Sequence, residues 1–124
     1  MIQEVLVAVY GSLRKGMGNH RLIEREEGTL LSTERIKGWE MYSYGGFPFI
    51  RPSENPDDEI TIEVYVLPIT AMQPLDRLEG YPSFYDRKLV DTSKGKAWIY
   101  FIDQEGNDAR VTNGDWVDYK GRQY

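Results

Sequence analysis

The clearest hydrophobic pattern in the chain lies at residues 60–67, where the side chains alternate in character. One face of the predicted strand would carry Ile60, Ile62, Val64 and Val66, and the other Thr61, Glu63 and Tyr65, because successive side chains of a strand point to opposite sides. Val5 to Tyr10 is a short, continuous apolar run that ends at Gly11. It is too short for a stable helix and is rich in valine, so it predicts a buried strand.

Two short helices are predicted. The first begins after Asn19, a residue type that caps helices, and continues to Arg25. The second covers residues 70–79 and ends at Gly80, which is followed by Pro82.

The remaining segments read as strands, turns and loops. Residues 28–49 contain strand-like stretches interrupted by glycines and a proline, and residues 51–59 are polar with two prolines, which predicts an exposed loop. Residues 87–91 and 96–102 are predicted to form a hairpin, and Asn113-Gly114 is predicted to form a turn in the segment 111–119.

This balance of elements predicts the fold class. Strands predominate beside two short helices, which favours an α+β domain with a strongly curved sheet or a small mixed β-barrel flanked by the helices. A chain of 124 residues with 40% apolar residues fits one domain, residues 1–124, with a modest core. Three Trp, nine Tyr and four Phe are many for this length, and such rings fill cores or line concave sites.

Composition then excludes several kinds of partner. The net charge is −5 and no cluster of Lys and Arg is present, so no nucleic-acid partner is expected. No apolar run approaches the ~20 residues of a membrane span, and the first residues lack the pattern of a signal peptide. We therefore expect no membrane association and a cytoplasmic protein.

Composition also limits the chemistry. The chain has no cysteine and a single histidine, His20, so we expect no metal site and no cofactor. A nucleophilic Ser12 would need His20 as its base, and no third residue that would orient such a pair can be identified. An exposed histidine in the first turn of a helix is the simpler interpretation.

Two other segments resemble ligand-binding motifs but lack the residues or the spacing that those motifs require. Residues 11–16 have the glycine spacing of a phosphate-binding loop, but Met17 and Gly18 stand where lysine and Ser/Thr are required. Nucleotide hydrolysis through this loop is therefore not expected. The acidic residues 57–59 lack the spacing of a calcium loop and are interpreted as a solvated turn.

The segment Tyr10-Gly11-Ser12-Leu13-Arg14 resembles the signature of the γ-glutamyl cyclotransferase-like (AIG2-like) family, nearest its γ-glutamylamine cyclotransferase branch. Further motifs follow in the family's order over nearly the whole chain. They are Asn19, Gly46-Phe47-Pro48, the segment from Asp76 to Pro82 that contains Glu79, Tyr85 with Arg87, and Gly114-Asp115-Trp116.

The resemblance implies a small β-barrel with a cavity at the end of the first strand. It implies that a small γ-glutamyl substrate binds there, held by Tyr10, Gly11, Ser12 and Leu13 through backbone amides and by Tyr85 and Arg87, with Glu79 as the catalytic residue. The family reaction releases an amine from a γ-glutamyl amide or γ-glutamyl amino acid and closes the glutamyl part to 5-oxoproline. The departing amine would be selected by the variable loops 42–51 and 82–85.

The residues suit that chemistry. The substrate's own α-amine attacks its γ-carbonyl, so no nucleophilic side chain is needed, and one carboxylate can accept and return the proton. Burial of Glu79 among rings such as Tyr10 and Tyr81 would raise its pKa from about 4.3. Two alternatives stay open: a non-catalytic protein that binds γ-glutamyl ligands, and a hydrolase that uses Ser12. For Arg87, pairing with a substrate carboxylate and pairing with an acidic neighbour both stay open.

Overall fold

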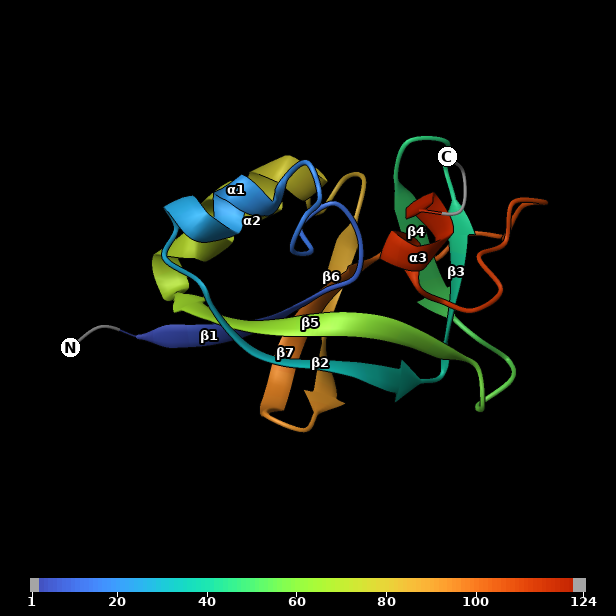
Figure 1. Ribbon diagram of the computed structural model, residues 1–124, viewed down its shortest axis with the longest axis horizontal. Coiled ribbons are helices and arrows are strands. Elements are labelled where there is room, and N and C mark those ends of the chain that lie inside the picture. Colours follow the sequence, from blue (N-terminus) through green and yellow to red (C-terminus); the bar gives the residue numbers. More distant parts are fainter. Residues whose placement is uncertain (1–2, 122–124) are drawn as a thin grey trace.

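The structure is a computed structural model that describes residues 3–121. Seven strands, three α-helices and one 3-10 turn follow one another along these residues (Figure 1). Their order is β1 (Glu4–Val9), α1 (His20–Arg25), β2 (Thr29–Lys37), β3 (Trp39–Ser43), β4 (Pro48–Pro52), β5 (Glu59–Pro68), η1 (Ile69–Ala71), α2 (Met72–Glu79), β6 (Asp86–Thr92), β7 (Gly95–Phe101) and α3 (Trp116–Gly121).

Five strands form the main sheet, in the order β2-β5-β1-β7-β6. β1 lies near its centre, antiparallel to β5 and parallel to β7, so that Val7 faces Tyr65 on one side and Trp98 on the other. β3 and β4 form a separate two-stranded hairpin. Figure 1 shows α1 and α2 together over one part of the sheet, with the β3–β4 hairpin and α3 at its other end.

The mixed α+β class is confirmed, but the predicted barrel is wrong, because the sheet is curled and open. Its edge strands are β2 and β6, and no backbone ladder joins these two edges within residues 3–121. They meet through side chains instead: Glu34 of β2 accepts hydrogen bonds from the backbone N–H and the hydroxyl of Ser93, in the turn after β6. A polar groove lined by both strands occupies the seam between them.

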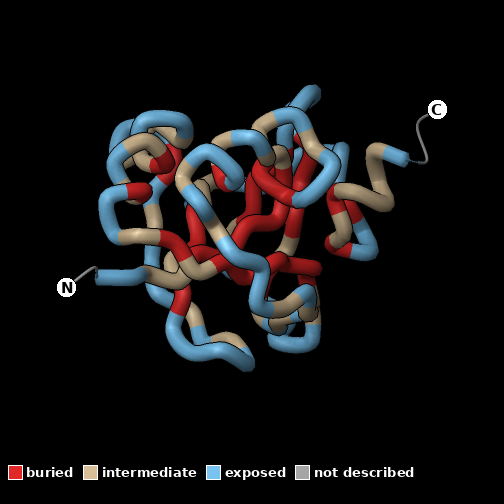
Figure 2. The backbone as a smooth tube through the Cα atoms, turned by 60° about the vertical axis from the view of Figure 1, so that its left-hand side comes forward, coloured by how far each residue is buried: buried red, intermediate tan, exposed pale blue. Residues whose placement is uncertain are grey.

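The buried segments gather in the interior of the molecule (Figure 2), and the core consists of two clusters of buried residues. Alternating residues of the central strands divide between two buried clusters, since Val7 and Val9 of β1 join one and Ala8 joins the other. The first cluster also contains Ile23 of α1 and Leu75 of α2, and the second contains Trp116 of α3. The end of β1 is therefore enclosed by elements from the whole chain.

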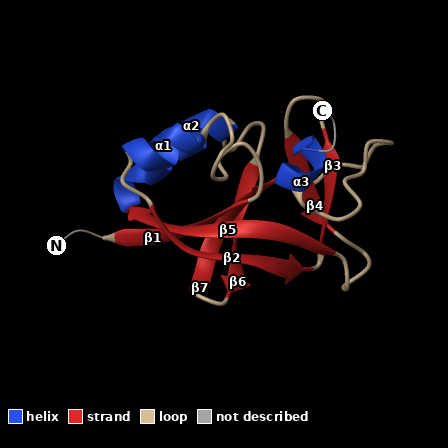
Figure 3. Ribbon diagram, viewed as in Figure 1, coloured by secondary structure: helices blue, strands red, loops and turns tan. Residues whose placement is uncertain are grey.

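Most predicted elements are confirmed (Figure 3). The alternation at residues 60–67 is present in β5, but both faces are buried, and Thr61 and Glu63 lie inside. The turn at Asn113-Gly114 forms through a hydrogen bond from Gly114 N–H to Val111 O. The helix α3 was missed, although Asp115 accepts a hydrogen bond from the backbone N–H of Asp118, a capping pattern that marks a helix start.

Candidate active site

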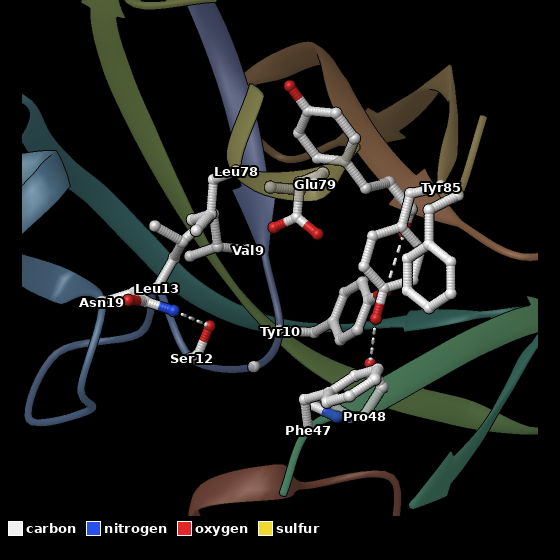
Figure 4. Close-up of a pocket in the computed structure, with 14 residues that line it drawn as sticks. Val9, Tyr10, Ser12, Leu13, Asn19, Phe47, Pro48, Leu78, Glu79 and Tyr85 are labelled. Carbon is white, nitrogen blue, oxygen red and sulfur yellow. Dashed lines mark hydrogen bonds between the residues drawn. The ribbon is translucent and has the colours of Figure 1, made fainter. Parts of the chain in front are cut away.

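A cavity of about 240 Å³ opens at the carboxyl end of β1. Its walls come from β1 and the following loop, the start of β4, the end of α2 and the segment after α2 (Figure 4). The lining residues are Ala8, Val9, Tyr10, Gly11, Ser12, Leu13, Asn19, Phe47, Pro48, Leu78, Glu79, Phe84, Tyr85 and Tyr100. Glu79 is the one acidic residue among them, and the set contains no Lys, Arg or His.

Glu79 is the last residue of α2, which ends because Gly80 adopts a left-handed conformation with φ of 67°. Its carboxylate points into the cavity, with Val9, Leu13 and Leu78 on one side and Tyr10 and Tyr85 on the other (Figure 4). Burial raises the pKa of Glu79 from 4.5 to about 7. A carboxyl group with that pKa can gain or lose a proton near neutral pH.

Two tyrosines that line the cavity are fixed by their hydroxyl groups. Tyr10 donates to the backbone O of Tyr100 at 2.8 Å, and Tyr85 donates to the backbone O of Pro48 at 2.6 Å. Burial, with the nearby charge of Glu79 as a smaller contribution, raises the pKa of the Tyr85 hydroxyl well above its usual value. Both rings are thus fixed, uncharged walls beside the carboxylate.

Arg14, which is buried, anchors the loop after β1 to the rest of the structure. Arg14 Nε lies 2.8 Å from Glu63 Oε2 of β5, and its Nη1 lies 2.9 Å from Asp115 Oδ1, next to α3. Glu63 Oε1 also accepts a hydrogen bond from the backbone N–H of Lys15 at 2.9 Å. The first and last motifs of the sequence are therefore joined through one buried side chain.

Ser12 and Asn19 form the polar side of the cavity. Asn19 Nδ2 donates to Ser12 Oγ at 2.9 Å, so the Asn19 side chain holds the loop, and it makes no capping hydrogen bond to α1. His20 Nδ1 lies 2.9 Å from the carbonyl O of Leu13, which engages this ring nitrogen away from Ser12. The geometry therefore gives no support to a Ser12–His20 nucleophile pair.

The structure places Arg87 outside the cavity lining. Its Nε and Nη2 bind Asp76 Oδ1 and Oδ2 at 3.0 and 3.3 Å, and its guanidinium lies between the rings of Tyr81 and Trp98, 4.4 and 4.3 Å from their centres. The sequence left open whether Arg87 pairs with a substrate carboxylate or with an acidic neighbour, and in the structure it pairs with the acidic neighbour Asp76. Trp98 is half-buried under the guanidinium, whereas Trp116 lies in the core.

Six of the site residues predicted from the sequence line this cavity: Tyr10, Gly11, Ser12, Leu13, Glu79 and Tyr85. The sequence did not single out Tyr100 or Phe84. The signal for Phe84 was its place in the variable loop 82–85, beside Tyr85. Tyr100 had no comparable signal, because it reaches the cavity only through the pairing of β7 with β1.

Residues 3–121 contain no group of three or more His, Cys, Asp or Glu side chains arranged to hold a metal ion. No described helix has the length and apolarity needed to cross a membrane.

Comparison with known proteins assigns the family. Residues 7–118 match the model of the family described as gamma-glutamyl cyclotransferase, AIG2-like. The chain therefore belongs to this family, which places it in a class of cyclotransferase-like enzymes.

Individual relatives agree with that assignment. The gamma-glutamylcyclotransferase family protein YtfP of Escherichia coli is 30% identical over 113 residues, covering 90% of this chain and 96% of its own. A protein of Methanocaldococcus jannaschii whose name also refers to gamma-glutamylcyclotransferase is 33% identical over 120 residues, covering 93% and 98%. The crystal structure of an uncharacterized protein from Pyrococcus horikoshii has the same fold, with a TM-score of 0.81 at 24% identity, covering 96% and 95% of the two chains.

Proposed function

We propose that the protein converts a γ-glutamyl amide to 5-oxoproline and a free amine, with Glu79 as the group that carries the proton. The observation that supports this most directly is a single carboxyl group in a largely apolar cavity, with its pKa raised to about 7 by burial. Perturbed carboxyl groups in concave sites are candidates for acid–base catalysis. The family to which the chain belongs supplies the reaction class.

The reaction moves two protons away from the substrate α-nitrogen, because the ammonium group carries three and the lactam nitrogen of 5-oxoproline keeps one. The carboxylate of Glu79 accepts a proton from the substrate α-ammonium, and the resulting amine attacks the γ-carbonyl carbon. A C–N bond forms and closes the ring, and the original amide C–N bond then breaks. Glu79 returns its proton to the departing nitrogen. It then accepts the second proton, which the ring nitrogen loses, and passes it to the released amine, which leaves as an ammonium ion, so the enzyme ends in its starting state. Because the nucleophile is tethered within the substrate, no covalent enzyme intermediate is needed.

We propose that the loop after β1 stabilises the negative charge that develops on the γ-carbonyl oxygen. Within this loop the carbonyls of Gly11 and Ser12 accept hydrogen bonds from Arg14 N–H and Asn19 N–H. The backbone N–H groups of Gly11, Ser12 and Leu13 are the donors that we propose for the substrate. Donors fixed in advance by a rigid loop stabilise such an oxyanion most effectively, and the buried Arg14 supplies that rigidity.

The test is a panel of γ-glutamyl amides incubated with the purified protein, with 5-oxoproline and free amine quantified together by chromatography and mass spectrometry. We expect the two products in equal amounts, and a loss of roughly 10²–10⁴ in rate for Glu79→Gln. Glu24→Gln, an exposed glutamate of α1, is the matched control and should retain full activity.

Two results would contradict the proposal. Release of free glutamate in place of 5-oxoproline would indicate a hydrolase. Saturable binding of γ-glutamyl amides with no product, in both the parent protein and the control, would indicate a protein that binds the ligand without turning it over.

A further inference from the structure

The mouth of the cavity carries three exposed aromatic rings that the proposed proton transfer does not use. Tyr44, Phe47 and Phe84 are 44%, 37% and 50% exposed. Their ring centres are nevertheless close together: 5.4 Å from Tyr44 to Phe47, 6.1 Å from Phe47 to Phe84 and 6.5 Å from Tyr44 to Phe84. Phe47 and Phe84 line the cavity directly. We call these three residues the aromatic rim.

The aromatic rim is held in place by the surrounding structure. Its members come from the β3–β4 turn and from the segment between α2 and β6, which are far apart in the sequence. Tyr44 N–H donates to Phe47 O at 2.7 Å, and Phe84 N–H donates to Gly80 O at 2.8 Å. The ring of Phe84 also lies 5.1 Å from that of the buried Tyr85. A fixed cluster of exposed apolar rings beside a cavity is typical of a ligand-binding surface.

The polar side chains of the cavity and its aromatic rings lie on opposite sides of Glu79, and Val9, Leu13 and Leu78 lie on the side of the polar ones (Figure 4). In Figure 4, Ser12 and Asn19 lie on one side of the Glu79 carboxylate, and Phe47 and Tyr85 lie on the other. The glutamyl part of a substrate carries an ammonium and a carboxylate and requires the polar side. The departing amine then extends past Glu79 toward the aromatic rim. This order places the carboxylate between the two nitrogen atoms that exchange the proton.

Charge restricts the kind of amine that fits there. Phe47 and Phe84 offer neither a cation nor a side-chain hydrogen-bond donor. A carboxylate on the departing amine would therefore lack the partners that Ser12 and the backbone N–H groups of the loop offer to the glutamyl part, and it would lie near the negative charge of Glu79. An ammonium group on the amine would gain little from phenylalanine faces that are half-exposed, since cation–π attraction is weak at such sites. An uncharged apolar group, in contrast, covers rings that water otherwise contacts.

We propose that the aromatic rim is the binding site for the departing amine and selects amides of uncharged amines that carry an aromatic or bulky apolar group. This inference rests on the proposed function, because it names the substrate class of the same site. It assigns specificity to Tyr44, Phe47 and Phe84 and assigns the chemical step to Glu79.

The test compares four probes that share the glutamyl part: the γ-glutamyl amides of benzylamine, methylamine, glycine and 1,4-diaminobutane. Contacts with an apolar group change kcat/KM by roughly 10–200-fold in enzymes of known specificity. We therefore expect the benzylamide to exceed the methylamide by about tenfold or more in kcat/KM. The glycine and diaminobutane amides, which carry a carboxylate and an ammonium group, should fall below the benzylamide.

Phe84→Ala should lower kcat/KM for the benzylamide more than for the methylamide, and so remove most of the preference for the benzylamide. Leu89→Ala is the matched control: Leu89 is an exposed apolar residue (45%) on β6 that does not line the cavity, and its loss should leave the benzylamide-to-methylamide ratio unchanged.

The outcomes separate this inference from the proposed function. Equal rates for all four amides, or an unchanged ratio in Phe84→Ala, would overturn the rim assignment while the proposed function stands. A preference for the diaminobutane amide that Phe84→Ala abolishes would overturn it in favour of a cation site. If no probe yields 5-oxoproline, the proposed function is wrong. Calorimetry of amide binding then tests separately whether the aromatic rim binds the amine. Tighter binding of the benzylamide than of the methylamide, lost in Phe84→Ala, would support the rim, and equal binding would overturn it.

Discussion

Gly11 lies directly against Pro48, so that a Cβ atom on Gly11 would stand 2.6 Å from Pro48 Cγ and 3.0 Å from its Cδ. The contact joins the loop after β1 to the start of β4, and both segments line the cavity. Pro48 has little freedom to move away, since its carbonyl accepts the hydrogen bond of the Tyr85 hydroxyl at 2.6 Å. Gly11 is therefore required by packing, in addition to its place in the loop whose backbone amides are expected to hold the substrate.

The substitution Gly11→Ala tests this contact. The added methyl group must displace a rigid ring, and overpacking of this kind typically costs about 1–3 kcal/mol. We expect a lower melting temperature and reduced 5-oxoproline formation. Gly18→Ala is the matched control, because a Cβ atom there meets no atom within 4 Å. A Gly11→Ala protein that matches the parent in both measurements would show that the loop tolerates the added volume.

The pH dependence of the rate tests the state of Glu79. The carboxylate form is the proton acceptor, and with a pKa of about 7 it is depleted as the pH falls below neutrality. We expect kcat/KM to fall about tenfold for each pH unit on the acidic side of that value. The ionisation of the substrate ammonium is measured on the substrate alone and divided out. An acid limb near 4.5, the ordinary pKa of a glutamate, would show that Glu79 is solvated in the free enzyme.

Local patterns in the sequence were sufficient for most of the framework. The apolar run of β1, the alternation in β5 and the glycine that ends α2 each depend on neighbours within a few residues, and each was predicted. Motif order was sufficient to place Glu79 near the loop after β1, some seventy residues away in the chain.

What could not be predicted depends on contacts between distant segments. The curled sheet would close only if β2 and β6 paired through their backbones. The contact between these two edges is made instead by the side chain of Glu34, which accepts a hydrogen bond from Ser93 N–H. Glu63 can be buried because it pairs with Arg14, which is distant in the sequence. The alternation of side chains in β5 assigns Glu63 to one face of the strand but does not show which residues cover that face. The aromatic rim, likewise, exists only because the β3–β4 turn folds against the segment that carries Phe84.

The pairing of Arg87 with Asp76 leads to a prediction about stability. Asp76 lies one turn before Glu79 in α2 and also accepts a hydrogen bond from Tyr100 O–H at 2.7 Å. If Arg87 acts by holding this end of α2, Arg87→Met and Asp76→Asn disturb the same interaction. We expect each to lower the free energy of unfolding by about 1–3 kcal/mol, between the values for exposed and buried pairs, and the double variant to be little worse than either single one.

The control for this cycle is the exposed pair of Lys96 and Asp91. Lys96→Met should change the free energy of unfolding by about 0.5 kcal/mol or less. A direct role of Arg87 in substrate binding predicts a different pattern: a raised KM in Arg87→Met, additive with the effect of Asp76→Asn. That result would restore Arg87 to the substrate site.

The raised pKa of Glu79 also predicts how stability depends on pH. The carboxyl group titrates near 7 in the folded protein and near 4.5 when it is exposed to water. Between these values the folded state holds the proton that the unfolded state has lost, so the free energy of unfolding decreases as the pH rises. This difference in pKa between the folded and unfolded states corresponds to a loss of about 3 kcal/mol once the pH exceeds 7. The Glu79→Gln variant has no charge to bury and avoids this loss.

We therefore expect Glu79→Gln to be more stable than the parent at pH 8 and equal to it near pH 4, in urea titrations at a series of pH values. The exposed Glu24→Gln control should show no such crossover. A parent protein that gains stability between pH 5 and 8 relative to Glu79→Gln would mean that the folded state favours the ionised carboxylate. The charge on Glu79 would then be stabilised by its surroundings, which is the opposite of what a desolvated base in an apolar cavity requires.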